Sequence, residues 1–333
     1  MMRRGHRLKV VLLSAAILTI LVVGLILLRN ADQARYAETR ASMSDGFGQL
    51  RTVEYNGATY REKPAITTLL IAGIDKTDTT SDRVSNTYRN GGQADFLMLV
   101  AIDHTDKQIC QLQIDRDTMT DVVTLGIFGN ETGTRNMQIC LSHAFGKTPA
   151  DNARYTIRAV QNLLEGIEID DYYIVNYTAV PVLNDLLGGV TVHMDYDMTS
   201  VHPGWQKGLD ITLHGQEAED FVRSRMTVGA GTNEERMVRQ NEFMRKAFSR
   251  MSERIKADTS FADTLVKSLR EIAETNLTAR ELTNELSQAV GYEILPVDHP
   301  EGEYTIGKDG FVEFHMREGA AVQWVLDHLY SRL

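Results

Sequence analysis

The sequence is poor in cysteine and proline, with two cysteines and six prolines among 333 residues. Two cysteines exclude a disulfide-dense scaffold, and 25 glycines fall far short of the share that a collagen-like chain needs. We find no internal repeat at a period of 20–50 residues, which excludes solenoids and propellers. Hydrophobic residues make up 43% of the chain and charged residues 24%, an ordinary globular composition with room for one large domain or two small ones.

Positive charge is scarce beyond the N-terminus. Residues 1–30 carry five basic side chains and no acidic one, so residues 31–333 hold 30 basic against 45 acidic side chains. A body with this negative balance repels nucleic acid unless a local basic patch overrides the mean field. We therefore expect no nucleic-acid partner.

One long apolar run stands near the N-terminus. Residues 10–28 contain no charge, and 19 residues are about the length that crosses a bilayer as a helix. Residues 1–9 form the more basic flank, so the positive-inside rule predicts a cytoplasmic tail there and an extracytoplasmic location for everything after the run. A cleaved signal peptide is the alternative, although its apolar core is usually shorter. We predict a single-pass anchor in the cell membrane.

The rest of the chain alternates between strand and helix patterns. Residues 29–63 are polar and predict a stalk, and the folded body is expected to begin near Pro64. Apolar or alternating runs predict strands, and apolar residues at helical spacing predict helices. The expected strands are 66–75, 95–103, 107–115, 172–177, 190–195 and 311–316, and the expected helices are 149–165, 178–187, 214–224, one opening at Thr232, 261–289 and 318–332.

This order predicts an α/β (α+β layered) fold, with a central mixed sheet covered by helices on both faces. We assign residues 64–257 to one main folded domain. Residues 258–333 are expected to form a C-terminal extension of helices and a strand packed on the same domain.

Acidic residues are expected to meet at one edge of this sheet. The turn between strands 95–103 and 107–115 is too short for a parallel crossover, so the strands must be antiparallel and Asp95 should face Asp115. If strand 66–74 is also antiparallel to its neighbour, Asp75 reaches the same edge. Crowded carboxylates repel one another unless a cation such as Mg²⁺ joins them, with phosphate oxygens completing its shell. The alternative is a set of ordinary acids that cap turns.

A group of arginines surrounds a second predicted helix start. Arg223 and Arg225 leave the end of one helix, and Arg236, Arg239 and Gln240 occupy the first two turns of the next. Free N–H groups and the helix dipole favour an anion at such a terminus. Four arginines in an acidic body predict a phosphate clamp. The alternative is a solvated helix face that pairs with neighbouring glutamates.

The two cysteines both follow the predicted anchor, in a compartment where disulfides persist. Cys110 lies in a predicted strand and Cys140 near the start of a predicted helix. We predict one Cys110–Cys140 bridge. The alternative is a pair of buried small hydrophobic residues.

A family resemblance emerges from the order of several fragments between about Thr67 and Met251. They are LLIAGID, QADFLMLVAID, CQLQIDRDTM, YYIVNYTAVPVLNDLLGGVTV, GLDITLHGQEAEDFVRSR and NEERMVRQNEFM. Each fragment alone is weak, but their succession resembles the extracytoplasmic domain of the LytR-CpsA-Psr family. The resemblance implies a phosphotransferase that moves a cell-wall glycopolymer from an undecaprenyl-pyrophosphate carrier to peptidoglycan.

The resemblance also implies roles for single residues. The family's metal-binding aspartates, which hold Mg²⁺ or Mn²⁺, match Asp75 and Asp95. Its pyrophosphate-contacting residues match Arg116, Arg223, Arg225, Arg236 and Gln240, and Arg239 also falls on a family position. Arg116 would stabilise the reacting phosphate. Asp117 is the candidate base or a residue that orients an arginine.

The chain departs from the family pattern at two points. It has Gln93-Ala94-Asp95 where members usually read Arg-Ser-Asp, and Asp115 where they usually have proline. Two other functions therefore stay open at this point. One is a regulatory protein that binds a polyprenyl phosphate without turning it over, and the other is a hydrolase of the lipid pyrophosphate.

Overall fold

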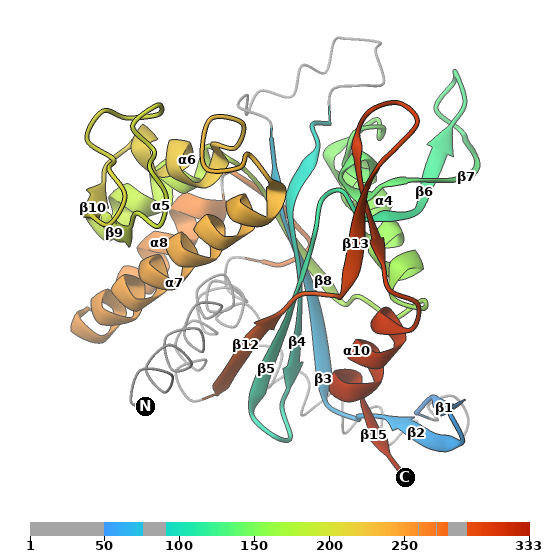
Figure 1. Ribbon diagram of the computed structural model, residues 1–333. Coiled ribbons are helices and arrows are strands. Elements are labelled where there is room, and N and C mark those ends of the chain that lie inside the picture. Colours follow the sequence, from blue (N-terminus) through green and yellow to red (C-terminus); the bar gives the residue numbers. More distant parts are fainter. Residues whose placement is uncertain (1–49, 76–90, 259, 271, 279–291) are drawn as a thin grey trace, which may run out of the picture.

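The structure is a computed structural model that describes residues 50–75, 91–258, 260–270, 272–278 and 292–333 (Figure 1). The predicted cytoplasmic tail and membrane anchor lie outside these ranges. Within the described ranges, no helix combines the length and the apolar character needed to cross a membrane.

A six-stranded mixed sheet forms the centre of the fold. Its strand order is β11 (Ala273–Thr275), β8 (Asp171–Asn176), β3 (Ile66–Ile74), β4 (Ala94–Asp103), β5 (Gln108–Ile114) and β12 (Glu293–Asp298). The pairs β3–β4, β4–β5 and β11–β8 are antiparallel, whereas β3–β8 and β12–β5 are parallel. The predicted mixed sheet and its antiparallel central strands are confirmed.

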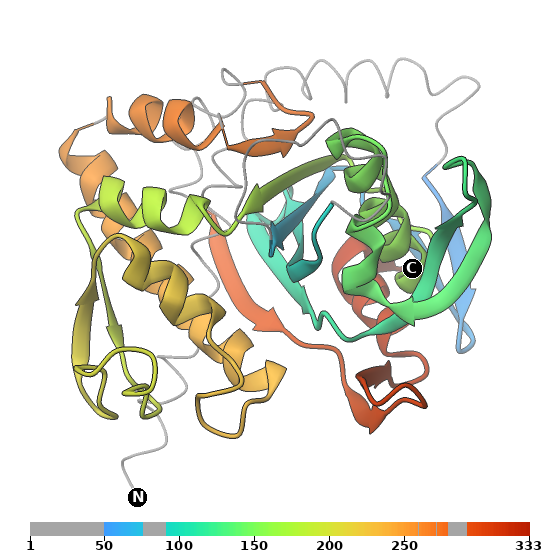
Figure 2. The same cartoon turned by 90° about the horizontal axis from the view of Figure 1, so that it is seen from above.

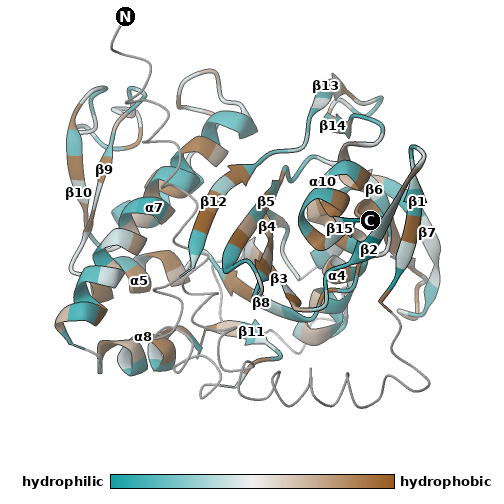
Figure 3. Cartoon of the chain, turned by 90° about the horizontal axis from the view of Figure 1, so that it is seen from below, coloured by the Kyte–Doolittle hydropathy of each residue, from teal (hydrophilic) through white to brown (hydrophobic). Residues whose placement is uncertain are grey.

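The central strands are buried on both faces, as their continuous apolar runs predict. All ten residues of β4 are buried. Because successive side chains point to opposite faces, Phe96 and Met98 enter one hydrophobic core while Leu97 and Leu99 enter another. Figure 3 shows apolar residues gathered on these strands.

Helices cover both faces of the sheet (Figures 1 and 2). One face carries α5 (Ala179–Leu187), α6 (Gln216–Arg223), α7 (Asn233–Ala257) and α8 (Phe261–Arg270), together with strands β9 (Val190–His193) and β10 (Asp210–Leu213). The other face carries α4 (Pro149–Leu163), α10 (Ala320–Leu329) and the 3₁₀ helix η1 (Ile139–His143).

The starts of two helices lie where the sequence predicts them. The Thr148 hydroxyl accepts a hydrogen bond from the Asp151 N–H at 3.1 Å, and the Thr232 hydroxyl accepts one from the Glu235 N–H at 3.2 Å. Each bond satisfies an N–H group that the first turn leaves without an intrahelical partner. The second cap fixes the start of the helix that carries the predicted arginine group.

The folded body begins earlier than Pro64, inside the expected stalk. β1 (Thr52–Tyr55) and β2 (Ala58–Glu62) form a hairpin, and the C-terminal β15 (Tyr330–Arg332) pairs with β2. Asn56 and Gly57 both have positive φ, 48° and 75°, as a two-residue hairpin turn requires. This Asn-Gly pair is the local sequence signal for the hairpin. At the C-terminus, β15 takes the place of the last residues of the helix predicted over 318–332.

The C-terminal residues complete the central sheet. The helix expected over 261–289 stops at Arg270, and β11 follows three residues later at one edge of the sheet. β12 forms the opposite edge. Beyond it, β13 (Gly302–Ile306) and β14 (Val312–Met316) form a hairpin, which we call the C-terminal hairpin. A further hairpin, β6 (Met119–Leu125) and β7 (Glu131–Gln138), follows β5.

The predicted disulfide is absent, since both cysteines are free and buried. Cys140 lies in η1 with its Sγ atom 3.1 Å from Arg116 Nη2, and burial raises the pKa of its thiol to about 12. Cys110 lies in the core beneath α10, where it interacts with His328. The two thiols have different neighbours, so the alternative of two buried small hydrophobic residues holds.

A charged contact fastens α10 to β12. Asp298 accepts a hydrogen bond from Trp324 Nε1 at 2.9 Å and lies 3.1 Å from His328 Nε2. Burial alone would lower the pKa of His328, but hydrogen bonds to Asp298 and Cys110 raise it to about 9. The imidazolium form therefore stabilises this contact.

Candidate active site

The three central strands β3, β4 and β5 each place one end at the same side of the sheet. We call this side, formed by strand ends and not by the outer strands β11 and β12, the edge of the sheet that holds the site. Asp75 follows β3, Asp95 is the second residue of β4, and Arg116 follows β5 by two positions. Gly73 pairs with Phe96, and Leu97 pairs with Ile114. This register brings Asp95 level with Arg116, one residue beyond the Asp115 that the sequence indicates. The predicted meeting of acidic residues and arginine at this edge is otherwise found.

Two arginines hold the buried Asp95 carboxylate. Arg116 Nη1 donates to Oδ1, and Arg236 Nη1 donates to Oδ2 at 2.9 Å. Arg236 comes from α7, 141 residues further along the chain, and is only 3% exposed. Two guanidinium groups therefore converge on one carboxylate, and Asp117 lies beside Arg116 as a second acid. Guanidinium groups held in this way present donors that match the oxygens of an anion.

Arg116 is fixed on several sides. Its Nη2 atom donates to Gln93 Oε1 and lies close to Cys140, while its Nε atom is 3.3 Å from Asp117 Oδ1. Burial alone would lower the pKa of Arg116, but the neighbouring Cys140, Asp95 and Asp117 raise it above its usual value. The side chain is therefore permanently charged, and its hydrogen-bond donors are held in place before any ligand binds.

Gln93 connects Arg116 to the other acidic residue. The Gln93 N–H donates to Asp75 Oδ1 at 2.6 Å, while its side chain accepts from Arg116. The family usually has an arginine two residues before Asp95. In this chain the neutral amide at that position fixes Arg116 and Asp75 relative to each other.

Arg223 approaches the same group from the end of α6. Its Nη2 atom lies 3.4 Å from the carbonyl oxygen of Asp75, and Glu219 pairs with its Nη1 atom at 2.9 Å. Arg223 and Arg116 therefore reach the same edge of the sheet. Arg225 interacts electrostatically with Asp117.

Arg239 occupies a different place from the one expected. Its Nε and Nη1 atoms donate to the carbonyl oxygens of Phe221 and Glu235, both at 3.3 Å, and Nη2 donates to that of Ser224. Burial lowers its pKa to about 10. Arg239 thus fastens the end of α6, which carries Arg223, to α7.

Asp117 is buried next to the arginines. Burial raises its pKa, the charge of Asp115 adds to this rise, and Arg116, Arg225 and Arg236 oppose it. A raised pKa makes a carboxylate a better proton acceptor once it is ionised.

A contact that the sequence did not indicate reaches Asp115 from the C-terminal hairpin. Tyr304 Oη donates to Asp115 Oδ2 at 2.6 Å, and Asp115 Oδ1 accepts the Asp117 N–H at 2.8 Å. The Phe314 N–H also donates to the Asp117 carbonyl at 2.8 Å. The hairpin therefore holds the Asp115-Arg116-Asp117 turn. No local signal shows this, since Tyr304 is 189 residues from Asp115.

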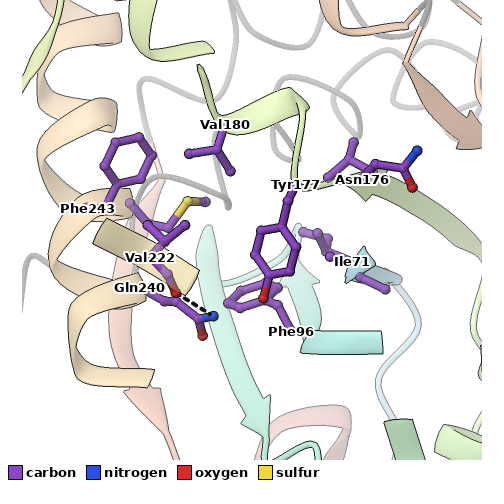
Figure 4. A pocket seen from close by; sticks show the side chains of 12 residues that line it. Ile71, Phe96, Asn176, Tyr177, Val180, Val222, Gln240 and Phe243 are labelled. Carbon is purple, nitrogen blue, oxygen red and sulfur yellow. Dashed lines mark hydrogen bonds between the residues drawn. The ribbon is translucent and has the colours of Figure 1, made fainter. Parts of the chain in front are cut away.

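An apolar pocket adjoins this charged group (Figure 4). It lies between the sheet and helices α5–α7, and its lining includes Ile71, Phe96, Tyr177, Val180, Val222, Gln240, Phe243 and Met244. Gln240 Nε2 donates to the carbonyl oxygen of Val222 at 3.3 Å. Gln240 is thus placed at the pocket, one turn of α7 beyond Arg236.

Several buried polar atoms at this place lack a hydrogen-bond partner among the described residues. They include Arg116 Nε, Arg236 Nε, Tyr177 Oη and Gln240 Oε1. An unsatisfied buried polar atom costs about 1–3 kcal/mol, so native proteins retain few of them. Tyr177 and Gln240 also line the apolar pocket, so their unpaired atoms are available to a group bound there.

The two candidate metal ligands fit a magnesium ion that a phosphate also binds. Within the described part of the chain, no three His, Cys, Asp or Glu side chains lie close enough to hold a metal on their own. Mg²⁺ needs only one or two carboxylates when phosphate oxygens and water complete its shell. Asp75 and Asp95 supply hard oxygen donors, and a carboxylate paired with arginine keeps further lone pairs.

The fold and the site define a class: an α/β domain with a group of arginines and carboxylates at one sheet edge, beside an apolar pocket. The sequence model of the LytR_cpsA_psr family matches residues 30–307, which is most of the chain. The protein therefore belongs to the LytR-CpsA-Psr family.

Curated relatives are similar over part of their length. TagU of Halalkalibacterium halodurans, a polyisoprenyl-teichoic acid–peptidoglycan teichoic acid transferase, is 29% identical over 157 residues, covering 47% of this chain and 44% of TagU. TagU of Bacillus licheniformis, which bears the same name, is 27% identical over 210 residues, covering 63% of this chain and 60% of that protein. The chain thus spans less than two thirds of the length of these relatives.

Solved structures share the fold. TagV of B. subtilis superimposes with a TM-score of 0.58 at 23% identity, covering 80% of this chain and 98% of TagV. TagT bound to LIIa-WTA superimposes with a TM-score of 0.57 at 21% identity, covering 79% of this chain and 89% of TagT.

Proposed function

We propose that the protein is a membrane-anchored extracytoplasmic phosphotransferase that moves a glycopolymer from an undecaprenyl-pyrophosphate carrier to peptidoglycan. The observation that carries this proposal is the buried arginine–carboxylate group at the mouth of an apolar pocket. A lipid pyrophosphate has the matching form, because its doubly charged head is joined to an apolar chain. The family and the names of the TagU relatives support the same activity.

The arginines would bind the pyrophosphate. Arg116 and Arg236 are buried and already fixed on Asp95, so they need little reorganisation when the ligand arrives. Arg223 and Arg225 lie at and just beyond the end of α6 and would close over the remaining oxygens. Guanidinium groups suit this role because their planar donors match phosphate oxygens in pairs.

A divalent cation would complete the site. Asp75 and Asp95 would hold Mg²⁺ or Mn²⁺, and the ion would neutralise part of the pyrophosphate charge. The ion would leave the arginines free to act on the oxygens that gain charge during the reaction.

The transfer itself would exchange one P–O bond for another. A sugar hydroxyl of peptidoglycan attacks the sugar-linked phosphorus, and the bond from that phosphorus to the bridging oxygen breaks. Asp117 accepts the hydroxyl proton, and the lipid leaves as a monophosphate that Arg116 and Arg236 stabilise. Positioning and charge stabilisation supply most of the catalysis in phosphoryl transfer.

The apolar pocket would receive the first part of the polyprenyl chain. Its lining comes from the sheet and from α5, α6 and α7. The predicted anchor over residues 10–28 would hold this pocket close to the outer surface of the bilayer.

A direct assay tests the proposal. The full chain in detergent is mixed with a lipid-pyrophosphate-linked sugar, peptidoglycan and MgCl₂, and the products are separated by mass. Sugar phosphate joined to peptidoglycan is expected, with its loss on chelation of Mg²⁺. Arg223→Gln should abolish transfer, whereas Arg154→Gln, an exposed arginine on α4, should not.

Other products would point to the other functions. Free sugar phosphate without acceptor labelling identifies a hydrolase. Retention of the donor with no product, for every donor and metal concentration, identifies a regulatory lipid-phosphate-binding protein.

A further inference from the structure

Tyr177 stands at the boundary between the apolar pocket and the arginines. It directly follows β8, and its N–H donates to the carbonyl oxygen of Ile74 at 3.2 Å, which fixes the backbone at the sheet edge. Its ring lines the pocket (Figure 4), and the residue is only 3% exposed. Its hydroxyl group is buried and has no hydrogen-bond partner among the described residues.

Charged groups surround the other side of Tyr177. The guanidinium carbon of Arg223 lies 5.2 Å from the centre of the tyrosine ring, a cation–π distance. The hydroxyl also interacts electrostatically with Asp95, Arg236 and Arg116. Tyr177 thus lines the apolar pocket and also contacts Arg223 of the arginine group.

The hydroxyl is a cost to the protein without a ligand. A buried hydroxyl with no partner is destabilising, and a phenylalanine would fill the same space without that cost. Burial raises the pKa of Tyr177 above its usual value, so the group keeps its proton and is a hydrogen-bond donor. A donor kept unpaired at this boundary indicates an acceptor that arrives with the ligand.

We propose that Tyr177 Oη donates a hydrogen bond to the phosphate that adjoins the prenyl chain of a prenyl-pyrophosphate ligand. This inference rests on the proposed function and deepens it, because that phosphate is the one that leaves with the lipid. The ring would pack against the first isoprene unit, while the hydroxyl would lie at the junction between the prenyl chain and the pyrophosphate. Tyr177 would thereby set the depth of the lipid in the pocket.

The variant Tyr177→Phe tests the proposal, with Tyr173→Phe as the matched control. Tyr173 lies on β8, is buried in the same core and does not line the pocket. Full-length protein in detergent with MgCl₂ is titrated calorimetrically with geranylgeranyl pyrophosphate and with inorganic pyrophosphate. Melting temperatures are measured without ligand.

Tyr177→Phe should bind both probes about tenfold more weakly, because one hydrogen bond to a charged oxygen is lost. Its melting temperature without ligand should stay the same or rise, since the unpaired hydroxyl is gone. A role in folding alone would lower the melting temperature and leave affinity for the folded protein unchanged. Tyr173→Phe should bind both probes like the wild type.

Affinity of Tyr177→Phe within twofold of the wild type for both probes would overturn the proposal. A loss confined to the prenyl probe would also overturn it, because that result assigns the effect to packing. Wild-type protein that binds the probes but transfers no sugar would refute the proposed function while this binding comparison still decides the role of Tyr177. Wild-type protein that binds neither probe would end both.

Discussion

Truncating Arg116 to alanine should slow transfer severely and leave the fold intact. The side chain joins Asp95, Gln93, Cys140 and Asp117 at the edge of the sheet. Alanine removes all these contacts together with one of the two cations on Asp95. Activity and stability should respond very differently, and their magnitudes can be compared.

The stability cost should be moderate because Asp95 keeps a partner. Breaking a buried ion pair costs about 3–5 kcal/mol when a charge is left alone. Here Arg236 still donates to Asp95 at 2.9 Å, so we expect about 1–3 kcal/mol. A domain of ordinary stability, about 5–15 kcal/mol, stays folded after such a loss.

The kinetic cost should be larger. Removing one preorganised donor from a site that stabilises developing charge slows catalysis about 10²–10³-fold. Arg116→Lys keeps the charge but loses the planar pair of donors, so it should recover only part of the rate.

Transfer rates of both variants would be measured in the peptidoglycan assay, alongside thermal unfolding by circular dichroism. Arg154→Ala, on the exposed surface of α4, serves as the control. A folded Arg116→Ala protein with the wild-type rate would remove Arg116 from the site. Loss of rate in strict proportion to loss of folded protein would show a structural role only.

Three further predictions concern the surroundings of the site. Both thiols should resist alkylation in the native protein and react fully in denaturant, because both are buried and burial keeps Cys140 protonated at neutral pH. A denatured protein that takes up no label and has a mass two units below that of the reduced chain would instead reveal a disulfide. The pKa of His328 is raised to about 9 in the folded state, so protonated His328 should add roughly 2 kcal/mol to the free energy of unfolding. This stabilisation is complete below about pH 6.5 and is lost as the pH rises through about 9. His328→Gln should flatten this part of the pH–stability curve, and an unchanged curve would refute the ion pair with Asp298. Tyr304→Phe should lower the transfer rate about tenfold by loosening the turn around Arg116, and it should have no further effect in a protein that already carries Asp115→Ala. Additive effects in this double-mutant cycle would show that the two residues act separately.

Much of the site was accessible from the sequence because its parts lie at the ends of predictable elements. Asp75, Asp95 and Arg116 each adjoin a strand with a clear apolar run, so the antiparallel order alone brings them together. Arg236 and Gln240 share a helix face whose start is set by the Thr232 cap. The error of one residue, Asp115 for Arg116 opposite Asp95, came from the turn, whose geometry sets the register.

Other assignments failed because their signals are not local. Arg239 shares the arginine-rich segment with Arg236, yet its donors turn to backbone carbonyls at the end of α6. The two cysteines suggested a bridge by their number and compartment, whereas packing separated them. The hairpin over 52–62 has a local signal, the Asn56-Gly57 turn, but the polar residues around this turn led to the prediction of a stalk.

The sequence by itself determined the mixed layered fold, the family and the acidic and basic residues that meet at the sheet edge. Apolar periodicity and strand order are local properties of the chain, and they suffice for these conclusions. Only the tertiary structure decided which partners each group has: Arg236 on Asp95, Tyr304 on Asp115, and a tyrosine hydroxyl left unpaired beside an apolar pocket. These contacts join residues far apart in the chain, and they depend on how helices and hairpins pack on the sheet, which no local pattern encodes.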